Sequence, residues 1–139
     1  MQKKNYPLKE RKASFKISRN LFFSFKYAFN GIFYCFQSSR NFKIQICFAT
    51  VVFLLAFIFN LEFYEYLIIC STVFSVIILE LLNSSIESFI DLIVGNNFNK
   101  LAQISKDCAA GAVLLAAINS IFVACFIFIP KIKLLILNL

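Results

Sequence analysis

The sequence predicts an all-α integral membrane protein, with three helices that cross the bilayer and a preceding helix that lies on the membrane surface. Of the 139 residues, 60% are hydrophobic and only 15% are charged, whereas about a quarter of the residues in a typical soluble domain are charged. Two long stretches carry no charged residue, which is typical of membrane-spanning segments. The length suits one compact domain.

The positive charge is concentrated before the first long apolar stretch. The net charge is +7, and residues 1–16 form a basic segment that we expect to be a flexible head. From about 17 to 36, phenylalanines recur at three- and four-residue steps, which predicts an amphipathic helix with an aromatic stripe. The residues of this stripe are Phe22, Phe25, Phe29, Phe33 and Phe36. Basic and aromatic residues are interleaved here, so we expect an anionic membrane surface and not nucleic acid as the partner.

Three crossings are predicted, at about 44–61, 66–94 and 102–130, followed by a short tail at 131–139. The first is close to the ~20 residues that a bilayer requires. Glycine and asparagine in "GNNFNK" supply turn chemistry between the second and third crossings.

The basic residues also predict the orientation of the chain. The turn with Glu62 and Glu65 has no Lys or Arg, and the later loop is followed by Lys100 and Lys106. The positive-inside rule therefore places the N-terminus in the cytoplasm, although the basic tail would then end outside. We expect a bacterial cytoplasmic membrane or, because Phe, Ile, Lys and Asn usage suggests an AT-rich genome, a plastid membrane.

Four polar residues are aligned in the second predicted crossing. Glu80, Asn83, Glu87 and Asp91 are offset by 3, 7 and 11 positions, which places them on one stripe of a helix that advances about 100° per residue. Carboxylates inside a membrane cost several kcal/mol each unless they face partners, water or a metal. The stripe therefore marks a candidate functional site.

The stripe allows three interpretations. Glu80 is the deepest carboxylate, and desolvation would suit it to act as a general base. Glu87 and Asp91, nearer the cytoplasmic end, could hold Mg²⁺ together with nucleotide phosphates. Alternatively, Asn83 and protonated acids form a polar seam between helices, or Glu80 and Glu87 form the proton relay of a small ion-coupled transporter.

Lys106 and Asp107 follow the predicted cytoplasmic loop. A lysine there could bind a phosphate as a point charge, or it could simply extend from a helix end towards water. Elsewhere, the five cysteines are far apart and histidine is absent, which argues against structural zinc. The absence of a P-loop or a Gly-rich kinase loop excludes a soluble-type kinase fold.

Three segments in order resemble the prokaryotic diacylglycerol kinase family, which includes the undecaprenol kinases of Gram-positive bacteria. They are "FKYAFNG" with the following "RNFKI", then "ELLNSSIESFID", then "SKDCAAGAVLLAAI". The resemblance covers about residues 20–128. It implies that residues 17–130 form a homotrimeric membrane lipid-kinase domain, with active sites between subunits near the cytoplasmic interface.

The resemblance also implies the reaction. ATP would be the co-substrate with Mg²⁺, and the acceptor would be diacylglycerol, giving phosphatidate, or undecaprenol, giving undecaprenyl phosphate. The residues of the first and third segments are more similar to those of the undecaprenol kinases in the family. The alternative is a catalytically weak or silent relative that acts as a membrane structural or accessory subunit.

The family's roles are carried over by position in the matching segments. Glu80 matches the catalytic base, which takes the proton of the lipid hydroxyl, and Glu87 matches a metal and nucleotide ligand. Asn83 and Asp91 occupy polar positions of the same helix. The expected nucleotide contacts are Tyr27, Lys106 and Asp107.

Two positions depart from the family pattern. Ser39 stands where the family commonly has a glutamate as second metal ligand, so we expect weaker Mg²⁺ affinity because fewer hard anionic ligands are left. In the loop beside the nucleotide, Asn97, Phe98 and Asn99 replace the usual side chains, and the resemblance implies that these three residues contact the nucleotide.

Overall fold

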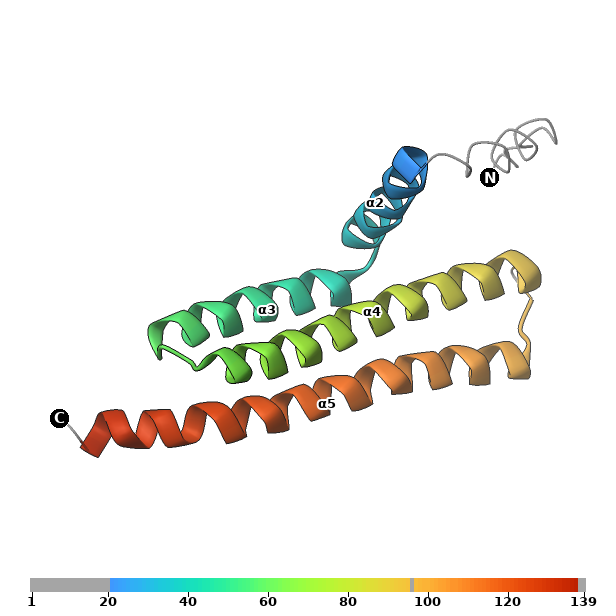
Figure 1. The fold of residues 1–139 in the computed structure, drawn as a ribbon. Coiled ribbons are helices and arrows are strands. Elements are labelled where there is room, and N and C mark those ends of the chain that lie inside the picture. Colours follow the sequence, from blue (N-terminus) through green and yellow to red (C-terminus); the bar gives the residue numbers. More distant parts are fainter. Residues whose placement is uncertain (1–20, 96, 138–139) are drawn as a thin grey trace. The chain divides into compact units, whose positions relative to one another are not determined.

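The computed structural model describes residues 21–95 and 97–137. These residues form four helices and no strand: α2 (Leu21–Ser38), α3 (Arg40–Ile58), α4 (Phe63–Val94) and α5 (Lys100–Leu137) (Figure 1). Helices α3, α4 and α5 are each long and apolar enough to cross a membrane. The prediction of an all-α chain with three long apolar helices is therefore confirmed. The basic head and residues 17–20 lie outside the described residues.

The chain divides into two compact units, Met1–Ser38 and Ser39–Leu139. Helix α2 belongs to the first unit, and nearly all of its side chains are exposed, including the predicted aromatic stripe. Exposed aromatic side chains suit the interfacial region of a bilayer. The position of α2 on a membrane surface stays a prediction.

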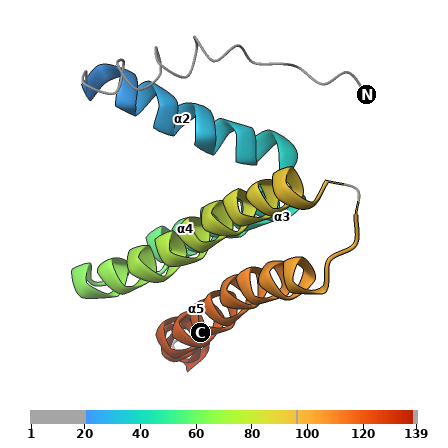
Figure 2. The same ribbon diagram turned by 90° about the vertical axis from the view of Figure 1, so that its right-hand side faces the viewer.

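In the second unit, α5 runs antiparallel to α4 along its length, and α3 packs against α4 (Figures 1 and 2). Helix α3 has 19 residues and α4 has 32. Ser39, immediately before α3, bonds to Glu80 in α4. Residues 81–94 of α4 therefore extend past the start of α3, by about 21 Å at 1.5 Å per residue.

Helix α3 begins at Arg40, four residues before the predicted crossing, because Ser39 caps it. The Ser39 hydroxyl accepts the backbone N–H of Phe42 at 3.2 Å, which satisfies one of the unpaired donors at a helix start. The same residue thus sets the position of the helix and contacts Glu80.

The turn between α3 and α4 packs around a small apolar cluster. Ala56, Leu61 and Ile69 are buried there with Phe128 of α5, and the rings of Phe59 and Phe128 meet edge to face with centroids 5.9 Å apart. Where these side chains would otherwise face water, their burial contributes about 25 cal/mol to the stability of the fold for each Å² of apolar surface. This cluster joins all three helices at the end opposite the α4–α5 turn.

Helix α5 continues through Pro130 to Leu137, seven residues beyond the predicted end of the third crossing. Proline inside a helix removes one backbone hydrogen bond, so it is a common reason to end a predicted helix. Here Lys131 Nζ lies 2.8 Å from Glu65 Oε2, and this ion pair attaches the turn after Pro130 to α4.

Candidate active site

Glu80 is the most buried carboxylate of the predicted stripe, with only 2% of the residue exposed. Its Oε1 accepts a hydrogen bond from the Ser39 hydroxyl at 2.9 Å, and its Oε2 accepts one from Gln45 Nε2, also at 2.9 Å. Both oxygens act as acceptors, which suits the ionised form of the carboxylate. A buried charge is tolerated when such hydrogen bonds replace water.

Gln45 is a site residue that sequence reasoning missed. Its signal is that Gln45 carries the only side-chain amide in the apolar stretch 44–58. Ser39, considered in the sequence only as a missing metal ligand, also contacts Glu80 directly. Two neutral donors, the N-cap residue of α3 and a residue within α3, therefore hold the carboxylate of α4.

Asn83 and Glu87 lie one turn apart on the same face of α4. Asn83 Nδ2 donates to Glu87 Oε1 at 2.9 Å. Asn83 is buried, and its Oδ1 has no hydrogen-bond partner among the described residues. The stripe thus presents a half-buried carboxylate beside an unpaired amide oxygen, and both are hard oxygen donors.

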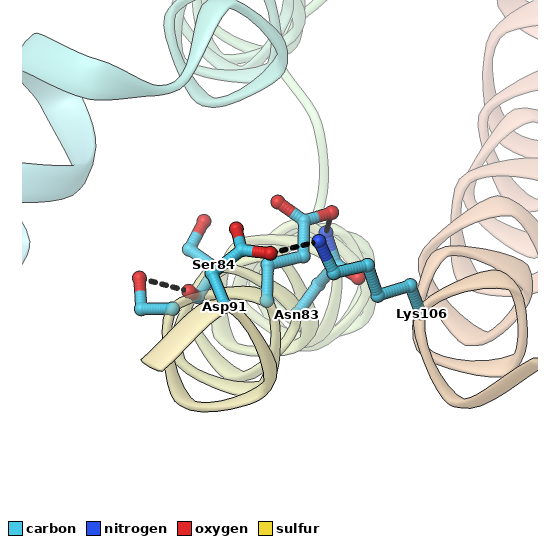
Figure 3. A network of polar contacts seen from close by, with 6 residues as sticks. Asn83, Ser84, Asp91 and Lys106 are labelled. Carbon is cyan, nitrogen blue, oxygen red and sulfur yellow. Dashed lines mark hydrogen bonds and ion pairs between the residues drawn. The ribbon is translucent and has the colours of Figure 1, made fainter. Parts of the chain in front are cut away.

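Asp91 and Lys106 connect the ends of α4 and α5 near their turn. Figure 3 shows the Lys106 side chain extending from α5 towards Asp91, whose Oδ1 accepts a hydrogen bond from Lys106 Nζ. The Asp91 side chain is 64% exposed and that of Lys106 is 34% exposed. Because an ammonium group has three donor hydrogens, Lys106 can bind an anion while this pair persists. Asp107 is exposed.

The turn after α4 depends on glycine and asparagine. Gly95 has φ 60°, a conformation that strains other residues. Asn99 Oδ1 accepts the backbone N–H groups of Leu101 at 2.9 Å and Ala102 at 3.2 Å, so this side chain caps α5. Asn97 and Phe98 are exposed.

The nucleotide contacts predicted for Asn97, Phe98 and Asn99 stay predictions. So does that of Tyr27, an exposed residue of α2 in the other unit.

A cavity of about 350 Å³ lies between α3, α4 and α5. Its wall is apolar except for Gln45 and Ser120. Gln45 Oε1 and the Ser120 hydroxyl are both buried and have no hydrogen-bond partner within residues 21–95 and 97–137. Gln45 therefore contacts Glu80 through its nitrogen and lines the cavity as well.

The described residues contain no group of three or more acidic, Cys or His side chains arranged to hold a metal ion. Mg²⁺ in nucleotide sites is commonly bound through one or two carboxylates together with substrate phosphates and water. Glu87, with the unpaired Oδ1 of Asn83 beside it, fits that pattern.

Three long apolar helices, with the buried carboxylate of Glu80 near the middle of α4, are typical of an integral membrane protein with a polar site between its helices. The model of the prokaryotic diacylglycerol kinase family matches residues 26–128. This chain belongs to that family.

Two similar proteins support this family assignment. The chain is 42% identical over 127 residues to a diacylglycerol kinase of Synechocystis, covering 91% of this chain and 73% of the relative. It is 38% identical over 113 residues to the undecaprenol kinase of Bacillus subtilis, covering 81% of this chain and 91% of the relative.

Proposed function

We propose that this protein is a membrane lipid kinase that transfers the γ-phosphate of ATP to the hydroxyl of diacylglycerol or undecaprenol. Family membership and the two relatives support lipid kinase activity. The observation that carries the assignment of the site is the buried carboxylate of Glu80, held by two neutral donors, one of which, Gln45, also lines an apolar cavity.

Glu80 acts in this proposal as the general base. Each carboxylate oxygen has two lone pairs, so the bonds from Ser39 and Gln45 leave acceptor positions for the lipid hydroxyl. Glu80 takes the hydroxyl proton as the lipid oxygen attacks the γ-phosphorus and the bond to the bridging oxygen of ADP breaks. Phosphoryl transfer needs mainly positioning and charge stabilisation, which a helical bundle can supply.

The nucleotide lies on the opposite side of Glu80 from the cavity, along residues 81–94. Lys106 offers an ammonium group for a phosphate, and Glu87 with Asn83 offers oxygen ligands for Mg²⁺. When bound, Mg²⁺ neutralises charge on the β- and γ-phosphates. The resemblance implies two anionic metal ligands, and Ser39 replaces one of them. Glu87 is therefore the remaining anionic ligand.

The lipid occupies the cavity side, where apolar walls suit an acyl or isoprenoid chain. We place the α4–α5 turn and the N-terminus in the cytoplasm. The positive-inside rule supports this orientation, because Arg40, Lys43, Lys100 and Lys106 then lie at the cytoplasmic end. We further propose a homotrimer, which would cover part of the apolar surface that α3 and α5 leave exposed.

Phosphate transfer from labelled ATP in purified membranes tests the proposal, with diacylglycerol and undecaprenol offered separately. Glu80→Gln is the matched control, since a glutamine can still accept the Ser39 hydrogen bond. We expect Glu80→Gln to lower the rate by about 10²- to 10⁴-fold, with the oligomer unchanged on size-exclusion chromatography.

Full activity of Glu80→Gln would refute the role of Glu80. If the wild-type protein labels neither lipid over a wide Mg²⁺ range and binds no Mg·ATP, it is an accessory subunit and not a kinase.

A further inference from the structure

The two hydrogen bonds to Glu80 have fixed directions. The Ser39 oxygen accepts the backbone N–H of Phe42 at 3.2 Å, and its hydroxyl donates to Glu80 Oε1 at 2.9 Å. The backbone of α3 therefore anchors the Ser39 oxygen on one side while its proton is directed to the carboxylate. A hydroxyl in this position has little freedom to turn away.

The Gln45 amide is oriented in the same way. Glu80 Oε2 needs a donor, so Gln45 presents Nε2 to it at 2.9 Å. This orientation leaves Gln45 Oε1 buried on the wall of the cavity, with no hydrogen-bond partner in the part of the chain that the structure describes. An unpaired buried amide oxygen is unfavourable. The hydrogen bond to Glu80 therefore determines the orientation of the Gln45 side chain, although its oxygen is left unpaired.

We infer that Ser39 and Gln45 are positioning residues, which fix the Glu80 carboxylate in the orientation needed to accept the proton of the lipid hydroxyl. This inference rests on the proposed function. It gives Ser39 a role beyond the loss of a metal ligand: the residue adapts the start of α3 to hold the base. It also links the base to the lipid cavity through Gln45.

Steady-state kinetics on four variants tests the inference. Ser39→Gly removes the hydroxyl while glycine remains a well-tolerated N-cap residue, and Gln45→Met keeps the length of the side chain without its hydrogen bonds. Ser39→Thr retains the hydroxyl. Thr50→Val is the control, because Thr50 is exposed on the same helix and its hydroxyl donates to the Ile46 carbonyl of that helix.

We expect kcat to fall about 10- to 100-fold in Ser39→Gly and Gln45→Met, as small misplacements of a catalytic group do. The KM for Mg·ATP should stay within about twofold, a split that general loss of structure would not produce. Ser39→Thr should recover most of kcat, and Thr50→Val should match the wild type.

Infrared difference spectra provide a measurement that needs no turnover. The carboxylate band of Glu80 is identified by subtracting the spectrum of Glu80→Gln, and it should shift in Ser39→Gly and Gln45→Met but not in Thr50→Val. An unshifted band would show that the hydrogen bonds are absent and would overturn the inference.

Kinetics distinguishes failure of the inference from failure of the proposed function. Wild-type kcat in Ser39→Gly and Gln45→Met, in an active enzyme, overturns the positioning role alone. An inactive wild-type protein overturns both.

Discussion

Lys131 Nζ lies 2.8 Å from Glu65 Oε2, and the same oxygen accepts the backbone N–H of Glu62 at 2.7 Å. One carboxylate thus caps the start of α4 and holds the turn of α5 that follows Pro130. The contact explains how α5 remains attached to the bundle beyond a residue that normally ends helices.

Lys131→Met should lower the thermal unfolding midpoint by several degrees, because it leaves the buried Glu65 carboxylate without its cation. Glu65→Gln combined with Lys131→Met should be less damaging than Lys131→Met alone, since the uncompensated charge is then gone. Lys133→Met, at an exposed position of the same turn, is the control. Equal midpoints for Lys131→Met and Lys133→Met, measured in one detergent, would contradict a role for the ion pair.

Lys106→Met should weaken ATP binding while leaving folding stability nearly unchanged. Hydrogen bonds to charged groups are worth about 1.5–3 kcal/mol, so the KM for ATP should rise by roughly 10- to 100-fold. The pair with Asp91 is largely exposed, and such pairs contribute at most about 1 kcal/mol to folding. Lys100→Met, on the same helix, should leave the KM unchanged. A similar rise in both variants would indicate a general effect of charge and not a phosphate contact.

Glu87→Gln should raise the Mg²⁺ concentration needed for half-maximal activity, on the order of tenfold, because a neutral amide replaces an anionic ligand. The glutamine can still accept the Asn83 hydrogen bond through its side-chain oxygen, so the fold should be preserved. A magnesium titration at fixed, saturating ATP measures the effect. Glu62→Gln, at the other end of α4, is the control. An unchanged Mg²⁺ requirement in Glu87→Gln would exclude Glu87 as a ligand.

Asn99 has a capping role in the structure and a predicted nucleotide role, and two variants separate them. Asn99→Ala should destabilise the protein by about 1 kcal/mol through loss of the cap. Asn99→Asp keeps a capping oxygen and should retain stability. If Asn99 also contacts the nucleotide, the added negative charge in Asn99→Asp should raise the KM for ATP. Thermal unfolding and ATP titrations on both variants give the answer, and a wild-type KM in Asn99→Asp would leave the cap as its role.

The helices and the polar stripe could be predicted because each depends on local sequence. Long apolar stretches mark the three long helices, and the spacing of Glu80, Asn83 and Glu87 places them on one face. The Asn83–Glu87 bond follows directly from that spacing. These features need no knowledge of how one helix packs against another.

Contacts between helices could not be predicted in this way. The bonds from Ser39 and Gln45 to Glu80 join residues 41 and 35 positions apart, and they depend on the register of α3 against α4. The continuation of α5 past Pro130 depends equally on the distant Glu65. A single sequence contains the polar residues but not their pairing.

The unequal lengths of α3 and α4 have a consequence for how the enzyme depends on its bilayer. Helix α3, at 19 residues, spans about 28 Å, slightly less than the ~30 Å hydrocarbon thickness of a typical bilayer. Ser39 joins the start of this helix to Glu80, so the height of this proposed base relative to the lipid headgroups should follow the hydrophobic match of α3. We expect thicker membranes to submerge the Glu80 carboxylate and thinner ones to expose it to water. If Glu80 is the base, the acyl-chain length of the host lipids controls turnover, independent of the identity of the acceptor.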